Sequence, residues 1–113
     1  MSAHDVEIAE NIRKQIGGPA FFMIGAKTFM AVENGLQFRI MQNSKKVTTV
    51  IITLDANDTY TLKFYNIRGT NVKMLAEVSG VYVDSLHSVI SSHTGLELSM
   101  PRVYNARTGA RMI

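Results

Sequence analysis

The chain of 113 residues contains no cysteine and no long uncharged apolar run. The first absence excludes disulfide scaffolds, thiolate metal sites and cysteine nucleophiles, so stability has to come from burial of side chains. The second argues against a helix that crosses a membrane, which needs about 18 to 20 consecutive apolar residues. Met1 to Gln15 carries charges of both signs where a signal peptide has an apolar run. We therefore expect a cytoplasmic protein without a membrane partner.

Hydrophobic residues make up 46% of the chain and charged residues 19%, as in ordinary globular domains. A chain of this length fits one folded domain, which we place at residues 1–100. Of the 12 basic residues, Arg102, Arg107 and Arg111 follow Pro101, where there is no acidic residue. The remaining nine basic residues equal the nine acidic ones in number. Residues 101–113 are therefore expected to form a basic, flexible C-terminal arm that can contact phosphate.

The N-terminal residues predict an amphipathic helix followed by a short apolar run. Isoleucines recur every four residues between Asp5 and Ile16, with charged residues on the other faces. The Gly17-Gly18 pair is typical of a helix C-cap, and Pro19 cannot continue the same helix. Ala20 to Ile24 has the length of a strand, although a buried helical turn has the same pattern.

A β-hairpin and a third strand follow. Asn34-Gly35 separates two apolar-rich segments, Thr28 to Glu33 and Leu36 to Met41, and this pair is typical of a two-residue turn with positive φ at both positions. In the second segment apolar and polar residues alternate, which predicts a half-buried strand. Val47 to Leu54 is rich in β-branched residues and is predicted to be the next strand.

Two more strands and a helix complete the predicted fold. Thr59 to Tyr65 alternates between apolar and polar residues, and Val72 to Glu77 is a shorter strand. A helix capped by Ser79 and ended by Gly95 follows, and Leu96 to Met100 is a candidate edge segment. Spacings of three and four predict a buried stripe along this helix, with His93 partly buried: Tyr82, Leu86, Val89, Ile90 and His93. Short connections favour a meander. We predict an α+β fold in which an antiparallel sheet of about five strands carries the N-terminal and C-terminal helices on one face.

No constellation of residues predicts catalysis. His4, His87 and His93 lie in different surroundings, and the two helical histidines are about 240° apart around the helix axis. Asp55 and Asp58 belong to a turn that lacks the glycine and glutamate of a calcium loop. There is no nucleophile elbow, and no glycine loop joins a strand to a helix as in phosphate-binding motifs. We expect no metal site, no cofactor and no enzymatic activity.

Basic residues are concentrated on the predicted sheet. Six basic residues and two acidic ones lie between Leu36 and Leu75. Together with one aromatic residue, the basic residues form the predicted nucleic-acid-binding set: Arg39, Lys45, Lys46, Lys63, Tyr65, Arg68 and Lys73. Strand alternation sends Arg39, Lys63 and Tyr65 to the face opposite Phe38, with Lys73 a further candidate. Such a face can bind single-stranded nucleic acid through phosphate contacts and base stacking, but an ordinary solvated sheet has the same composition.

The same outward face carries apolar side chains. Ile51 is expected beside Tyr65, and Val47 is a candidate to join them. Together they can form an interface with a second copy or with another protein, and net charge does not separate this hypothesis from nucleic-acid binding.

Short motifs occur along most of the chain, as far as about Leu98: Gly17-Gly18, Phe21 or Phe22, Gly25-Ala26-Lys27, Phe29, Ile52-Thr53-Leu54, Asp58, Tyr60, Phe64, Val81-Tyr82-Val83-Asp84 and His93-Thr94-Gly95-Leu96. In this pattern the chain resembles a family of small uncharacterised phage and prophage proteins. The resemblance implies a mobile-element origin and the cytoplasm of a host cell. It implies an accessory binder of nucleic acid or of a host factor, such as a defence protein, and no particular activity.

We therefore expect a non-enzymatic binding module. Its first expected partner is DNA or RNA, and the alternatives are a host protein or a second copy in a homodimer.

Overall fold

The computed structural model describes residues 3–96 and residue 98. The helices are α1 (Ala3–Ile16), α2 (Gly18–Met23) and α3 (Leu86–Thr94), and a 3-10 turn at Val83–Ser85 precedes α3. The strands are β1 (Lys27–Val32), β2 (Gly35–Arg39), β3 (Thr49–Leu54), β4 (Tyr60–Arg68) and β5 (Asn71–Val81). The predicted arm at 101–113 lies outside the described residues, as does the predicted edge segment apart from Leu96 and Leu98.

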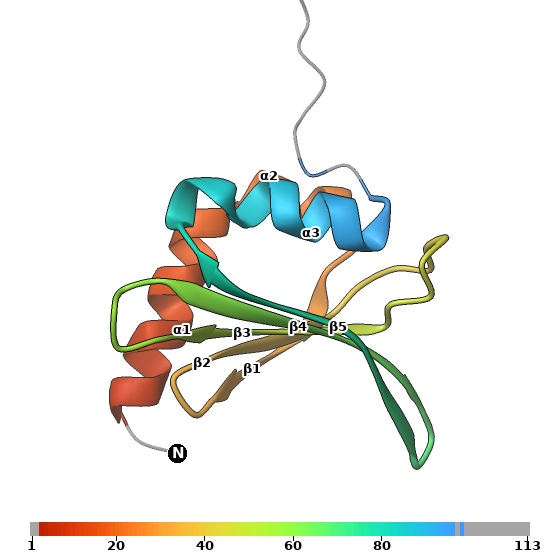
Figure 1. Ribbon diagram of the computed structural model, residues 1–113, viewed down its shortest axis with the longest axis horizontal. Coiled ribbons are helices and arrows are strands. Elements are labelled where there is room, and N and C mark those ends of the chain that lie inside the picture. The colour runs from red at the N-terminus through yellow and green to blue at the C-terminus, as the bar shows by residue number, and fades with distance from the viewer. Residues whose placement is uncertain (1–2, 97, 99–113) are drawn as a thin grey trace, which may run out of the picture.

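The five strands form one antiparallel sheet in the order β1-β2-β3-β4-β5. Every strand pairs with its neighbour in sequence, and the helices lie on one side of the sheet (Figure 1). This arrangement confirms the predicted α+β meander. We call the side that carries the helices the inner face and the opposite side the outer face.

One hydrophobic core lies between the helices and the inner face. Ile12 of α1, Phe38 of β2 and Phe64 of β4 are fully buried in it. Phe21 of α2 meets Phe38 edge to face, with 5.2 Å between ring centroids. Burial of a side chain of this size contributes roughly 1.5–3 kcal/mol. Side chains that alternate along β2, β3 and β4 thus form the inner face, and the intervening residues of those strands lie on the outer face.

The apolar run after the first helix forms a helix rather than a strand. Gly17 ends α1 with φ +90°, and its N–H donates to the Arg13 carbonyl at 2.9 Å. Pro19 lies in the first turn of α2, where a helix has no internal partner for an N–H and a proline is tolerated. Pro19 therefore opens the next helix, which buries Phe21. The prediction of a strand at Ala20 to Ile24 is wrong, and its helical alternative is correct.

The predicted hairpin is confirmed, but its turn lies one residue earlier. Val32 pairs with Gly35, so Glu33 and Asn34 form the loop. Of these two loop residues, only Asn34 has a positive φ, +57°. Gly35 is a strand residue that is needed for a different reason. A Cβ atom at Gly35 would lie 2.1 Å from the Ile52 carbonyl oxygen of β3. The close approach of two backbones, rather than turn geometry, requires glycine here.

The last helix begins later than its capping signal predicted. β5 continues to Val81, which pairs with Tyr60 of β4, so the residues after Ser79 are still in the sheet. Tyr82, placed by the sequence in the buried helical stripe, is instead 66% exposed. Leu86 and Ile90 are fully buried, as the helical spacing predicted. Pairing with β4 thus overrides the local helix signal between Ser79 and Tyr82.

Candidate nucleic-acid interface

Three of the predicted residues share the outer face. Arg39 pairs with Thr49, and Thr49 pairs with Tyr65 on the other side, so the three side chains form one row across the sheet. Lys63 lies two residues before Tyr65 on β4 and therefore points to the same face. The prediction that Arg39, Lys63 and Tyr65 share one surface is confirmed, and the helices lie on the opposite side (Figure 1).

The outer face is mixed in character rather than basic. Lys63 pairs in register with Glu77 of β5, so opposite charges lie side by side on this face. Its other neighbour, Ile51, is half-buried. Register also places three exposed apolar side chains on this face: Met30, Val72 and Met74. This composition resembles a surface for protein contact at least as much as one for phosphate.

Lys73 does not join this face, which corrects the sequence-based placement. The register of β4 and β5 shifts between Phe64 and Tyr65, where Leu75 is the additional residue of a bulge on β5. A bulge reverses the alternation that follows it. Lys73 therefore pairs with Asn66, which has the same parity as the buried Phe64. The side chain of Lys73 therefore belongs to the inner side of the sheet.

Lys45 and Lys46 lie in a well-bonded connection between β2 and β3. Asn43 holds this loop closed, because its Nδ2 donates to the Val47 carbonyl at 2.7 Å and its Oδ1 accepts from the Val47 N–H at 3.1 Å. Val47 is 2% exposed and anchors the loop in the core, so the expectation that it joins an outer interface is wrong. Both lysines remain exposed, and Lys46 has a positive φ of +62°.

Four of the predicted cations line one groove. The groove is bounded by the β2–β3 connection on one side and by the β4–β5 hairpin on the other; it is open to solvent and has a volume of about 390 Å³. Its lining residues are Lys45, Lys46, Asn66, Arg68, Lys73 and Leu75. None of these six residues is acidic. The side-chain amide of Asn66 donates to the Lys46 carbonyl at 2.7 Å and joins the two walls. We call this feature the basic groove.

The seven predicted residues therefore divide between two surfaces. Arg39, Lys63 and Tyr65 are on the outer face, whereas the other four belong to the basic groove. All seven lie between Leu36 and Leu75, where basic residues outnumber acidic ones, and this local excess is what groups them in the sequence. The signal that could have separated Lys73 from the outer face is the turn at Gly69 and Thr70, because a two-residue turn pairs Arg68 with Asn71 and hence Asn66 with Lys73.

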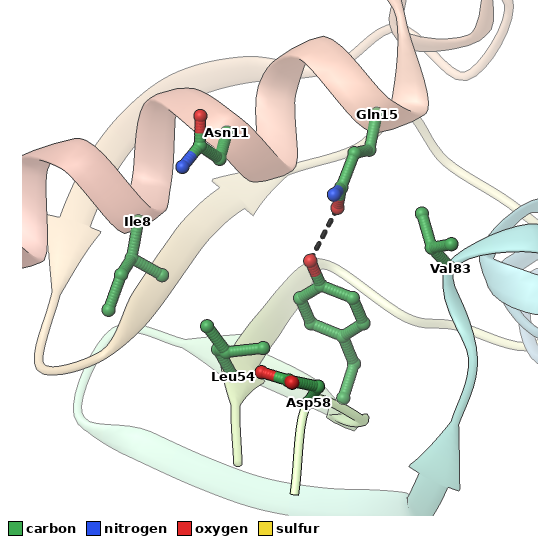
Figure 2. A pocket seen from close by; sticks show the side chains of 7 residues that line it. Ile8, Asn11, Gln15, Leu54, Asp58 and Val83 are labelled. Atoms are coloured by element: carbon green, nitrogen blue, oxygen red, sulfur yellow. Dashed lines mark hydrogen bonds between the residues drawn. The ribbon is translucent and has the colours of Figure 1, made fainter. Parts of the chain in front are cut away.

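A second hollow, of about 290 Å³, lies between α1 and the β3–β4 turn. The Tyr60 hydroxyl donates to Gln15 Oε1 of α1, and Figure 2 marks this hydrogen bond with a dashed line. Asp58, with φ +64°, stands at the same turn. Burial raises the pKa of the Tyr60 hydroxyl above its ordinary value. This hydrogen bond joins a helix to the sheet, and we assign the hollow a structural role.

Comparison of the chain with protein-family models, with curated proteins and with solved structures found no significant match. Over residues 3–96 and 98, no helix has the length and apolar character to cross a membrane. In the same part of the chain, no three histidine or carboxylate side chains are grouped as metal ligands would be.

Proposed function

We propose that this protein is a non-enzymatic nucleic-acid-binding module and that the basic groove is its binding site. The observation that supports the proposal is the convergence of Lys45 and Lys46 with Arg68 and Lys73 on one groove without an acidic residue in its lining. Four cations in one groove create a positive potential that attracts a phosphate backbone. The resemblance to phage and prophage proteins is consistent with such a partner inside a host cell.

The proposal implies a salt-dependent affinity. Each phosphate that a cation neutralises on a single strand contributes about −0.7 to the slope of log K against log salt concentration. Four contacts therefore give a slope of roughly −3. An association driven by apolar contacts, in which no phosphate is neutralised, has no such slope. The Asn66 bond to the Lys46 carbonyl fixes the groove before binding, which reduces the ordering cost on association.

The test compares two double charge reversals that change net charge equally. Lys45→Glu/Lys73→Glu alters the basic groove, and Arg39→Glu/Lys63→Glu alters the outer face. Affinity for a fluorescent 20-nucleotide oligomer is measured by anisotropy at several salt concentrations. We expect the affinity of the groove variant to fall about 25-fold or more at 0.1 M salt, the effect of two lost phosphate contacts. The outer-face variant should retain near wild-type affinity. Equal losses, or no binding by the wild type at low salt, would refute the proposal.

A second candidate function is protein interaction through the outer face, with a second copy as the partner. The specific observation is the set of exposed apolar side chains on this face, of which Val72 is the most exposed at 63%. Ile51 and Tyr65, the residues predicted for an interface, lie on the same surface. Apolar residues with a few charges around them are typical of protein contacts.

A further inference from the structure

A smaller hollow adjoins the basic groove on the side of α3. It encloses about 240 Å³ and is lined by Lys45, Val47, Phe64, Leu75, Ala76, Ser92 and His93. Lys45 and Leu75 line both features, so the two are adjacent. The β2–β3 connection passes close to the end of α3, since a Cβ atom at Gly95 would lie 2.8 Å from Ser44 Oγ. A chain of phosphates in the basic groove would therefore run past an aromatic hollow.

His93 presents a flat, fixed ring in this hollow. The imidazole stacks on the Phe64 ring, with centroids 4.9 Å apart and planes 11° apart. Its Nδ1 lies 3.0 Å from the Val89 carbonyl oxygen, which can only accept, so Nδ1 carries the hydrogen of this bond. Phe64 is fully buried beneath it. The stack and the hydrogen bond together hold the half-buried imidazole in place and leave Nε2 outside that bond.

We infer that this hollow receives one base of a single-stranded nucleic acid, stacked on His93, while the neighbouring phosphates contact the basic groove. The inference rests on the proposed function and specifies its substrate as a single strand. Histidine is among the side chains on which unpaired bases stack. Bases in a duplex are already stacked on each other and cannot enter a hollow, whereas an unpaired base can. Nε2, as an acceptor, can also receive a hydrogen bond from a base N–H.

The test uses His93→Leu, which keeps an apolar side chain against Phe64 but removes the stacking surface, and His93→Phe, which restores an aromatic ring. Both are compared with the wild type on single-stranded and duplex oligomers of the same sequence, and thermal unfolding checks that the variants fold. A single-stranded oligomer carrying one 2-aminopurine reports stacking through quenching of its fluorescence.

We expect the wild type to prefer the single strand and to quench 2-aminopurine. His93→Leu should lower single-strand affinity about ten-fold, within the range for one lost base–aromatic stack, and abolish the quenching with the salt slope unchanged. His93→Phe should restore both. Equal affinity for duplex and single strand, or wild-type behaviour of His93→Leu, would overturn this inference and leave groove binding standing. A wild type that binds neither oligomer would overturn both.

Discussion

The side-chain amide of Asn66 on β4 donates to the carbonyl oxygen of Lys46, with 2.7 Å between the two atoms. This bond connects the β2–β3 connection to the β4–β5 hairpin and so defines the width of the basic groove. Asn66→Ala removes the donor without changing a charge. We expect a loss of about 0.5–1.5 kcal/mol in the free energy of unfolding and a modest loss of affinity, because Lys45 and Lys46 are less well positioned.

The salt slope distinguishes this effect from loss of a cation. In Asn66→Ala all four cations remain, so the slope of log K against log salt should match the wild type. Urea denaturation and anisotropy titrations at three salt concentrations measure the two quantities. A slope reduced by a full phosphate contact would show that Asn66 does more than hold the groove.

Substitutions at Lys46 can change stability and binding independently. Its backbone has a positive φ of +62°, which affects stability, and its side chain lines the basic groove. A left-handed conformation costs a residue with a Cβ roughly 1–2 kcal/mol, and glycine avoids that cost while losing about 0.5–1 kcal/mol of backbone entropy. Lys46→Gly should therefore be at least as stable as the wild type and more stable than Lys46→Gln. Both should weaken oligonucleotide binding by roughly five-fold at 0.1 M salt, the effect of one lost phosphate contact. If urea denaturation showed Lys46→Gly to be less stable than the wild type or than Lys46→Gln, this account would be contradicted.

The sheet was predictable from the sequence because its signals are local. Alternation along Leu36 to Met41 and along Thr59 to Tyr65 sets which side chains enter the core, and short connections set the strand order. The buried Phe38 and Phe64 fit that pattern. This is why the shared face of Arg39, Lys63 and Tyr65 could be deduced without coordinates.

The basic groove could not be predicted in the same way, because it forms where the β2–β3 connection meets the β4–β5 hairpin, two segments that are distant in sequence. The bulge at Leu75, which no glycine marks, gives Lys73 a parity different from that of Glu77 on the same strand. The extension of β5 to Val81 likewise depends on pairing with β4, which overrides the helix cap signal at Ser79. His93 was interpreted as a partly buried core residue, and its stack on Phe64 becomes visible only once α3 is docked on the sheet.

Gly35 is the position in the hairpin where a single methyl group should be most costly. A Cβ there would lie 2.1 Å from the Ile52 carbonyl oxygen, and both strands are held by their ladder partners. Gly35→Ala should lower the free energy of unfolding by about 3 kcal/mol, as expected for a rigid overpacked site. Gly18→Ala is the matched control, because nothing lies within 4 Å of its Cβ. Urea denaturation of both variants measures the difference, and similar stabilities would contradict the packing of β2 against β3.

Ile51 tests the alternative role of the outer face. It lies between Gln37 and Lys63 in the sheet register, so a lysine in its place would add a charge to the centre of any interface formed there. If the protein forms a homodimer through this face, light scattering at high concentration gives twice the chain mass and Ile51→Lys restores the monomer. Phe22→Lys, an equally drastic change on the exposed surface of α2, should leave the dimer intact. A monomeric wild type rules this partner out.

Tyr60 makes the stability of the protein sensitive to alkaline pH. It is 5% exposed, and burial raises the pKa of its hydroxyl above the ordinary value of 10.0, with the negative charge of Asp58 acting in the same direction. The folded state therefore retains the proton where the unfolded state releases it, so this contribution to stability is complete below pH 10 and is lost as pH rises through the folded-state pKa. Its hydrogen bond to Gln15 ties the neutral side chain to α1 (Figure 2).

Tyr60→Phe removes both the hydrogen bond and the titration. At pH 8 the variant should be less stable than the wild type by about 1 kcal/mol, the net value of one such bond. Above pH 10 the wild type loses the contribution of Tyr60 and the variant has none to lose, so the difference between them should shrink. Urea denaturation of both proteins at pH 8 and at pH 10.5 measures this convergence. A difference that stays constant or widens with pH would show that the folded state does not hold the Tyr60 proton more tightly than the unfolded chain.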